Sequence, residues 1–274
     1  MSRVVVSNIA WEPADDAAVA AVMREHGVDG VELAPTKRWP DVTKASDGDA
    51  AAWRAHWAGL GMRVTSLQSL LFGRPDVLLF GTPADRRELC VVMRHVFRVA
   101  GALGAGPLVF GSPSNRRRGT LPMSEATRLA TPVFEELAVD AAAHGATLCI
   151  EPNPPQYACD FLTNTEECVA FLELVGSPAL GLHLDAAAMT LNGEDPDRAV
   201  DRAAPWLRHY HASEPFLAPV ERPTVPHAAH ARALARIGYA GHVAIEMRPS
   251  PDLPAADHVG AALRVVTDAY APLP

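Results

Sequence analysis

The sequence lacks cysteines at the spacing of a metal-binding or redox pair. Its four cysteines, Cys90, Cys149, Cys159 and Cys168, include no CxxC motif. Three of them fall inside predicted strands or helices, so we expect reduced and mostly buried thiols. Thiols of this kind are typical of a cytoplasmic protein.

Long apolar runs are also absent. No stretch is long enough to span a membrane, and Glu12, Asp15 and Asp16 interrupt the apolar region that a signal peptide needs. We therefore expect a cytoplasmic protein that does not enter a membrane.

Positive charge is scarce, since 24 Lys and Arg face 32 Asp and Glu, for a formal net charge of −8. Phosphate backbones are bound by clustered basic residues, so this balance argues against a nucleic-acid partner. A small-molecule substrate is the better expectation.

The first predicted strand, Val4–Val6, is not followed by a glycine-rich turn: the next residues are Ser7-Asn-Ile-Ala-Trp-Glu12. A dinucleotide-binding open sheet requires such a turn. The chain instead alternates strand and helix patterns about eight times, at roughly 34 residues per unit, which is the size of a βαβ repeat. This predicts a single (β/α)₈ TIM barrel over residues 1–274, with its site at the C-terminal ends of the strands.

The predicted strands and helices can be placed from apolar periodicity and glycine stops. Strands are expected at 4–6, 28–33, 62–68, 108–110, 147–150, 180–185, 207–211 and 243–246. Helices are expected at 15–26, 47–59, 83–103, from 124 onward, 164–175, 197–204, 227–237 and 256–269. Ser124 is the expected N-cap of the fourth helix, and Pro132 should kink or split that helix.

Four consecutive predicted strands, the fifth to the eighth, end in titratable residues: Glu151, Asp185, His211 and Glu246. Equivalent strand ends converge in a barrel, so these side chains should meet. Two glutamates, one aspartate and one imidazole form an oxygen-rich ligand set. It suits one divalent ion, Mn²⁺ or Co²⁺ first, with Mg²⁺, Zn²⁺ or Ni²⁺ also allowed. The alternative is a set of unrelated structural charges.

Two further histidines, His183 and His209, precede Asp185 and His211 by two residues. The two-residue period of a strand places them on the same side as those residues, one layer lower. His183 either supports the metal ligands or is a hydrogen-bonded core histidine, and the sequence leaves both interpretations open.

Several motifs resemble the sugar isomerase and epimerase barrels of the xylose-isomerase-like superfamily, especially the ketose 3-epimerase branch. The similarity covers nearly the whole chain. Its motifs are Gly30-Val-Glu-Leu33, Ile150-Glu-Pro-Asn153 with Tyr157 and Phe161-Leu-Thr-Asn164, Leu182-His-Leu-Asp185, Tyr210-His-Ala-Ser-Glu214 and Ala244-Ile-Glu246.

The resemblance implies a metal-dependent isomerase or epimerase of a small sugar or sugar derivative. Glu151, Asp185, His211 and Glu246 would hold the metal, and Glu151 and Glu246 would exchange the proton from opposite sides of the reacting carbon. The expected substrate-binding residues are Glu32, Gln68, Asn153, Tyr157, His183, Glu214 and Arg248. For Glu32, Gln68 and His183, a paired polar group of the barrel is an equal alternative. Barrels with a solvent-open mouth often use a partner subunit to cover it, so a homo-oligomer is a further expectation.

This chain departs from the pattern of those epimerases at two places. Ala188 stands where they carry a histidine, and Ser213-Glu-Pro-Phe-Leu217 stands where they carry an arginine. Contacts to the carbonyl end of the substrate should therefore differ.

Other functions stay open at this point. The same base and metal would serve a dehydratase acting on a keto-sugar or keto-inositol. A phosphodiesterase like the abasic-site endonucleases, or a binding protein without turnover, fits less well.

Two loop features have a functional and a structural interpretation. Asn115–Arg118 either binds an anion at the barrel mouth or is a solvated loop. Trp11, Trp39 and Phe72 either line an apolar wall of the site or pack in the core and loops.

Overall fold

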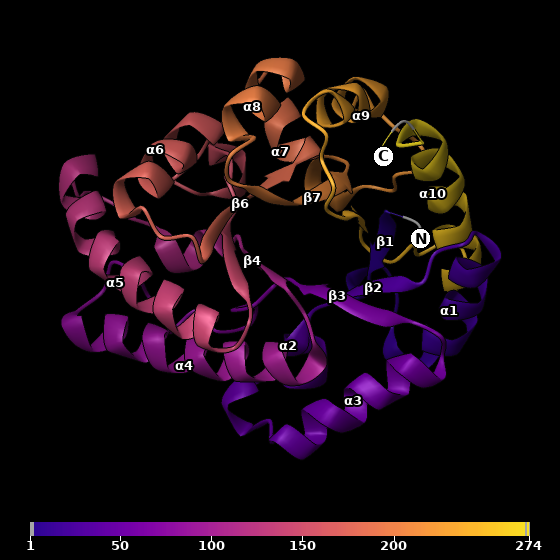
Figure 1. The fold of residues 1–274 in the computed structure, drawn as a ribbon, viewed down its shortest axis with the longest axis horizontal. Coiled ribbons are helices and arrows are strands. Elements are labelled where there is room, and N and C mark those ends of the chain that lie inside the picture. Colours follow the sequence, from indigo (N-terminus) through magenta and orange to yellow (C-terminus); the bar gives the residue numbers. More distant parts are fainter. Residues whose placement is uncertain (1–2, 272, 274) are drawn as a thin grey trace.

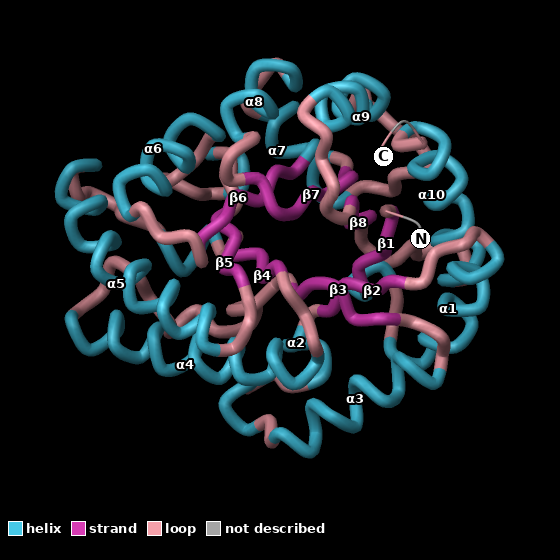
Figure 2. Tube along the Cα trace, viewed as in Figure 1, coloured by secondary structure: helices cyan, strands magenta, loops and turns pink. Residues whose placement is uncertain are grey.

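The computed structural model describes residues 3–271 and 273. Eight parallel strands form a closed barrel in sequence order, and β8 pairs with β1 to complete it. Figures 1 and 2 show the strands as a central ring with helices around it. The predicted (β/α)₈ barrel is confirmed.

The strands are short and lie close to their predicted positions. They are β1 Val4–Ser7, β2 Gly30–Leu33, β3 Arg63–Leu67, β4 Pro107–Phe110, β5 Thr147–Ile150, β6 Leu180–Asp185, β7 Leu207–Ser213 and β8 Val243–Glu246. Nearly all their residues are buried, because the barrel interior covers one face and helices cover the other.

The α-helices are α1 Asp16–Glu25, α2 Pro35–Arg38, α3 Asp47–Gly59, α4 Pro83–Leu103, α5 Met123–Ala143, α6 Thr165–Val175, α7 Ala186–Leu191, α8 Pro196–Ala203, α9 His227–Arg236 and α10 Ala255–Ala269. Short 3₁₀ turns are η1 Asn8–Ala10, η2 Pro13–Asp15, η3 Val42–Lys44, η4 Pro113–Arg116, η5 Pro155–Tyr157 and η6 Pro215–Leu217. Most of these turns follow a strand and so shape the rim of the barrel.

The expectation for the fourth predicted helix needs correction. Pro132 does not split α5, which is one helix from Met123 to Ala143, and Pro122 rather than Ser124 is at the N-cap. The buried neighbours Val133 and Phe134 pack this stretch against the barrel. Tertiary packing therefore outweighs the hydrogen bond that Pro132 cannot donate.

The sequence analysis missed helix α7, which directly follows β6, and ended β7 too early. In the structure β7 continues two residues past His211 to Ser213. Both changes add backbone around the C-terminal ends of β6 and β7.

The structure also tests the expectations about cysteines and membrane spans. All four cysteines are free and buried, as predicted. Among residues 3–271 and 273, no helix has the length and apolarity that a membrane span requires.

Close packing between β1, β2 and β3 requires a glycine at position 30. A Cβ atom there would lie 2.7 Å from Val5 Cγ1 and 2.9 Å from Thr65 Cγ2. Both neighbours are β-branched side chains that a strand holds in place, so neither can move away easily.

We predict that Gly30→Ala lowers the free energy of unfolding by about 1–3 kcal/mol, the usual cost of overpacking. Urea unfolding followed by circular dichroism measures it. Gly59→Ala is the matched control, because nothing lies within 4 Å of a Cβ at that position near the end of α3. Equal stability of the two variants would contradict the packing argument.

Candidate active site

A cavity of about 630 Å³ opens at the C-terminal ends of the strands. All four predicted strand-end residues line it: Glu151, Asp185, His211 and Glu246. The convergence expected from the barrel is therefore observed.

Glu151 follows β5 directly, and the surrounding loops hold its backbone. Its amide donates to the Phe110 carbonyl at 3.2 Å, and its carbonyl accepts from the buried guanidinium of Arg116. The carboxylate lies against the backbone of Gly111, where a Cβ would be 2.0 Å from Glu151 Oε2. A glycine at the end of β4 is thus a steric requirement for this position of the carboxylate.

Asp185 ends β6 and caps the helix that follows. One carboxylate oxygen accepts from the Ala188 amide at 2.6 Å, and the other accepts from the Ser213 hydroxyl. The same Ser213 oxygen accepts from the Ala187 amide at 3.2 Å. These bonds fix the carboxylate at the edge of the cavity.

His211 lies between the buried carboxylate of Glu32 and the carboxylates of Glu246 and Asp185, which line the cavity. Its Nε2 donates to Glu32 Oε1 at 2.9 Å. Its Nδ1 is 3.3 Å from Glu246 Oε2 and 3.9 Å from Asp185 Oδ2. A carboxylate on the far side of the ring orients the imidazole toward the cavity, as in metal sites.

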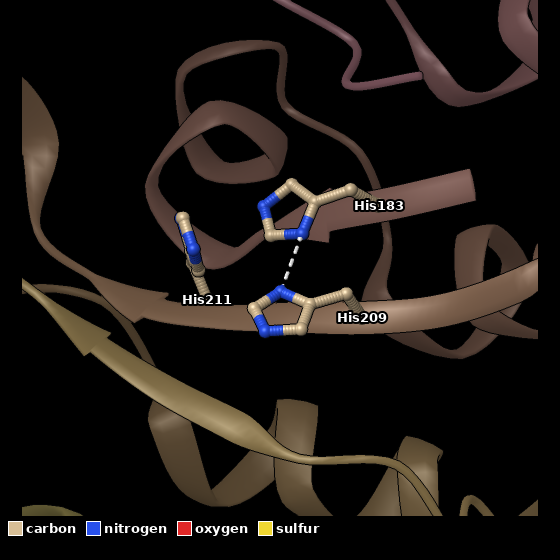
Figure 3. Close-up of side chains that lie close together, drawn as sticks. All are labelled: His183, His209 and His211. Atoms are coloured by element: carbon tan, nitrogen blue, oxygen red, sulfur yellow. Dashed lines mark hydrogen bonds between the residues drawn. The ribbon is translucent and has the colours of Figure 1, made fainter. Parts of the chain in front are cut away.

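Two more imidazoles lie beside His211 (Figure 3). His183 from β6 and His209 from β7 are joined Nδ1 to Nδ1 at 3.1 Å, and His209 Nε2 is 3.2 Å from Glu32 Oε2. The Nε2 of His183 is 3.8 Å from Glu151 Oε1. The sequence predicted that His183 and His209 lie on the same side of their strands as Asp185 and His211, one layer lower, but it left their role open.

Crowding of the carboxylates changes their proton affinity. Burial, reinforced by the negative charges of Asp185 and Glu246, raises the pKa of Glu151 to about 8. Burial and the charge of Glu246 raise the pKa of Asp185 to about 6. In the absence of a cation Glu151 therefore keeps its proton at pH 7, because ionisation of all three carboxylates would bring like charges together.

Below the cavity, the pKa values of Glu32 and His183 are lowered instead. Burial alone would raise the pKa of Glu32, but the charges of His211 and His209 and the hydrogen bonds from His211 and Ser66 lower it to about 2. Burial and the neighbouring imidazoles lower the pKa of His183 well below its ordinary value. Glu32 is therefore ionised and His183 is a neutral imidazole at pH 7.

The residues present fit a divalent cation. One candidate group consists of Glu151, His183, Asp185 and His211, whose ligand atoms all lie within 4.8 Å of one another. His183 Nε2 is fully buried and has no hydrogen-bond partner within the described part of the chain. Carboxylates that repel one another beside an unpartnered imidazole nitrogen are the chemistry that a metal ion stabilises.

Comparison with known proteins agrees with this geometry. The family model for xylose isomerase-like TIM barrels matches residues 20–268. The chain belongs to this family.

Solved structures of several xylose isomerase-like barrels share the fold. The 3-keto-D-glucoside 4-epimerase of E. coli is 15% identical, with a TM-score of 0.79, over 97% of this chain and 100% of that one. An L-ribulose 3-epimerase is 18% identical, with a TM-score of 0.82, over 99% and 95%. The IOLI protein, solved with a bound zinc atom, is 18% identical, with a TM-score of 0.76, over 98% of each chain. No curated protein sequence matches the chain.

The predicted substrate-binding residues of this xylose isomerase-like chain fall into two groups. Gln68, Asn153, Tyr157, Glu214 and Arg248 line the cavity. Glu32 and His183 do not: they are fully buried below its floor, where Glu32 contacts imidazoles and Ser66. We therefore correct the expectation that these two contact the substrate directly.

Glu214 lines the cavity, but its carboxylate is already engaged. It accepts from the Thr224 amide and hydroxyl at 2.8 and 2.5 Å, from the Val225 amide at 3.1 Å, and contacts His227 Nε2 at 3.0 Å. These contacts tie the segment before α9 to the end of β7. The structure thus gives Glu214 a role in holding the loop.

Of the three arginines in the loop after β4, only Arg117 is exposed to solvent. Arg116 is fully buried, and Arg118 binds the Asp160 carbonyl at 2.7 Å. Of this loop, Pro113, Ser114 and Asn115 line the cavity, but the arginines do not. The expectation of an anion site at Arg116 or Arg118 is therefore not supported.

Of the three aromatic residues expected at an apolar wall, only Phe72 lines the cavity. Trp11 is buried against Trp57, and Trp39 packs edge-to-face on Trp53. Core packing is the correct interpretation for both tryptophans.

Sequence reasoning missed three residues that hold the site. Ser66 donates to Glu32 Oε2 at 2.7 Å, Ser213 binds Asp185, and Arg116 binds the Glu151 carbonyl. An available signal for Ser213 was its place two residues after His211 on the same strand, and so on the same side.

We predict that Glu151 makes the metal-free protein less stable as the pH rises. Its pKa is 4.5 ordinarily and about 8 in the folded state, so in this range the folded state keeps a proton that the unfolded state has lost. Stability is then lost with rising pH, by about 1.4 kcal/mol per pH unit at most. In the presence of a chelator, the stability advantage of Glu151→Gln over wild type should grow between pH 6.5 and 8.

Urea unfolding at a series of pH values measures that difference. Glu135→Gln, at an exposed position of α5, gives the pH dependence of a variant that lacks one surface carboxylate. An advantage for Glu151→Gln that stays constant from pH 6.5 to 8 would show that Glu151 is already ionised there.

Proposed function

We propose that this protein is a divalent-metal-dependent isomerase or epimerase of a small sugar or sugar derivative. The observation that carries the proposal is the pair Glu151 and Glu246 in one cavity, on separate strands, with Asp185 and His211 between them in strand order. Such a pair suits a reaction that removes a proton and returns it. The family and the epimerases with the same fold support the choice of substrate class.

Glu151, Asp185, His211 and Glu246 would hold the metal ion. When bound, the ion supplies a Lewis acid that polarises a carbonyl and stabilises the negative charge that develops on its oxygen. Mn²⁺ and Co²⁺ suit three carboxylates and one imidazole, and Zn²⁺, Mg²⁺ and Ni²⁺ are further candidates.

Glu151 and Glu246 would carry the proton. One carboxylate takes the proton from the carbon next to the carbonyl, and the other donates a proton to the same or the neighbouring carbon. Return to the opposite face of the same carbon inverts it, whereas return to the neighbouring carbon moves the carbonyl. An ionised carboxylate beside the reacting carbon can accept its proton as a general base, and the protonated form can then return a proton as a general acid.

The cavity walls support a substrate with one polar and one apolar end. Gln68 and Asn153 contribute amide groups to the lining of the cavity. The Tyr157 and Phe216 rings also line it and are 5.5 Å apart, and the Tyr157 hydroxyl accepts from the Phe216 amide at 3.1 Å. Phe216 lies in the segment where related epimerases carry an arginine. We therefore propose a sugar derivative that presents an apolar face there, rather than a simple free ketose.

Arg248 is the cation best placed to bind an acidic group on the substrate. It lies two residues past Glu246, lines the cavity and is exposed at the rim. A phosphorylated or carboxylated sugar would use it.

We predict metal-dependent exchange of one carbon-bound hydrogen in the substrate. Metal-stripped protein, with and without Mn²⁺ or Co²⁺, is incubated in D₂O with ketoses, keto-inositols and phosphorylated sugars, and mass spectrometry and NMR follow deuterium. Glu246→Gln should slow exchange about 10²- to 10⁴-fold, the usual contribution of a general base. Glu135→Gln controls for the loss of an acidic side chain.

The outcomes separate the candidate reactions. Deuterium uptake with isomers as the only products supports the proposal. Loss of water from the substrate would instead assign a dehydratase. If Glu246→Gln exchanges deuterium as fast as wild type, the two-glutamate mechanism is wrong.

A further inference from the structure

Three buried imidazole nitrogens near the cavity have no hydrogen-bond partner among the described residues: His183 Nε2, His209 Nε2 and His211 Nδ1. His209 Nε2 and His211 Nδ1 lie 3.2 and 3.3 Å from a carboxylate, respectively, so the proposed reaction leaves the nitrogen of His183 unexplained. The side chain is fully buried, and its Nε2 has no hydrogen-bond partner among the described residues. A buried polar atom without a partner is costly unless something binds it. The carboxylate of Glu151 lies close to this nitrogen, with Oε1 at 3.8 Å.

The neighbouring hydrogen bonds determine which nitrogen of His183 carries the proton. Glu32 accepts from His211 Nε2 on one oxygen and faces His209 Nε2 on the other, at 3.2 Å. A carboxylate beside Nε2 favours the proton on that nitrogen, which leaves His209 Nδ1 as an acceptor. His183 Nδ1 then donates across the 3.1 Å contact, and its Nε2 presents a lone pair (Figure 3).

Glu32 therefore orients two imidazoles at once. It contacts His211 directly and reaches His183 through His209, while Ser66 holds the carboxylate from β3. In metal sites, such outer carboxylates fix the tautomer and direction of the ligating histidine. Here the same arrangement serves both His211 and His183.

The lone pair of His183 points into the group of acidic residues around the proposed metal. The ligand atoms of Glu151, His183, Asp185 and His211 all lie within 4.8 Å of one another, whereas Glu246 is outside this group and contacts His211. We propose that His183 Nε2 is a metal ligand, so that the ion is held by two imidazoles together with Glu151 and Asp185. This inference rests on the proposed metal-dependent function and changes the ligand set assigned to it.

Two consequences follow from a second imidazole. Nitrogen ligands favour Zn²⁺ and Co²⁺ over Mn²⁺ and Mg²⁺, so the metal preference shifts away from the oxygen-rich set. Four donors are also complete without Glu246. That carboxylate is then free for proton transfer at the substrate carbon.

X-ray absorption spectroscopy of the zinc-loaded protein tests the ligand directly, because imidazole rings give a characteristic scattering pattern that can be counted. Wild type should show two imidazoles per zinc, and His183→Asn should show one. Asparagine keeps a donor near the position of Nδ1 for His209 but has no atom at the place of Nε2. His230→Asn is the matched control, since His230 is a buried histidine that binds the Tyr210 hydroxyl outside the cavity.

Metal affinity gives a second readout that does not depend on activity. Competition with a chelator should show that His183→Asn weakens Zn²⁺ and Co²⁺ binding at least tenfold, and Mn²⁺ binding less. Circular dichroism confirms that each variant is folded before the affinity is compared. His230→Asn should bind all three ions as wild type does.

The results separate this inference from the proposed function. One imidazole per zinc in wild type, or an unchanged count and affinity in folded His183→Asn, would overturn the role of His183 while leaving a metal-dependent epimerase intact. A wild-type protein that binds neither Zn²⁺, Co²⁺ nor Mn²⁺ would overturn both.

Discussion

Mutual repulsion among acidic side chains is the constraint on which the site of this barrel depends. Glu151, Asp185 and Glu246 are brought together by the ends of β5, β6 and β8, where burial and like charge raise the pKa of Glu151 and Asp185. Such an arrangement costs stability unless a proton or a cation compensates it. The surrounding contacts, from Arg116 at the Glu151 carbonyl to Ser213 at Asp185, hold the acidic groups in place against that repulsion.

Below the cavity floor, the carboxylate of Glu32 behaves in the opposite way, because its pKa is lowered. Glu32 is fully buried, yet its pKa is held near 2 by two imidazoles and a hydroxyl. The partners of its two oxygens are the imidazoles of His211 and His209 and the hydroxyl of Ser66, so it can remain ionised without water. The barrel thus has one carboxylate that is satisfied by the protein and, above it, a group that is not. That contrast distinguishes a structural charge from a site.

Much of this could be predicted from sequence, because the relevant signals are local. Short, largely apolar runs that end in Glu151, Asp185, His211 and Glu246 identify the strand ends, and the barrel brings those ends together. The role of Glu32 could not be found in this way. It meets His211 across the barrel, 179 positions away, and no spacing rule joins β2 to β7.

Other errors came from competition between local and tertiary effects. Pro132 disfavours a helix locally, but burial of the flanking residues keeps α5 whole. Glu214 lies beside the cavity, where a substrate contact is a reasonable expectation. A loop that begins ten residues later occupies its carboxylate instead, and loop conformations of this length are not readable from residue patterns.

Gly111 has a consequence for how such an enzyme can change over evolutionary time. The Glu151 carboxylate occupies the volume that any larger side chain at position 111 would fill. A larger residue at position 111 would push the Glu151 carboxylate out of its present place. Substitution at position 111 is therefore limited by the carboxylate that this backbone position faces.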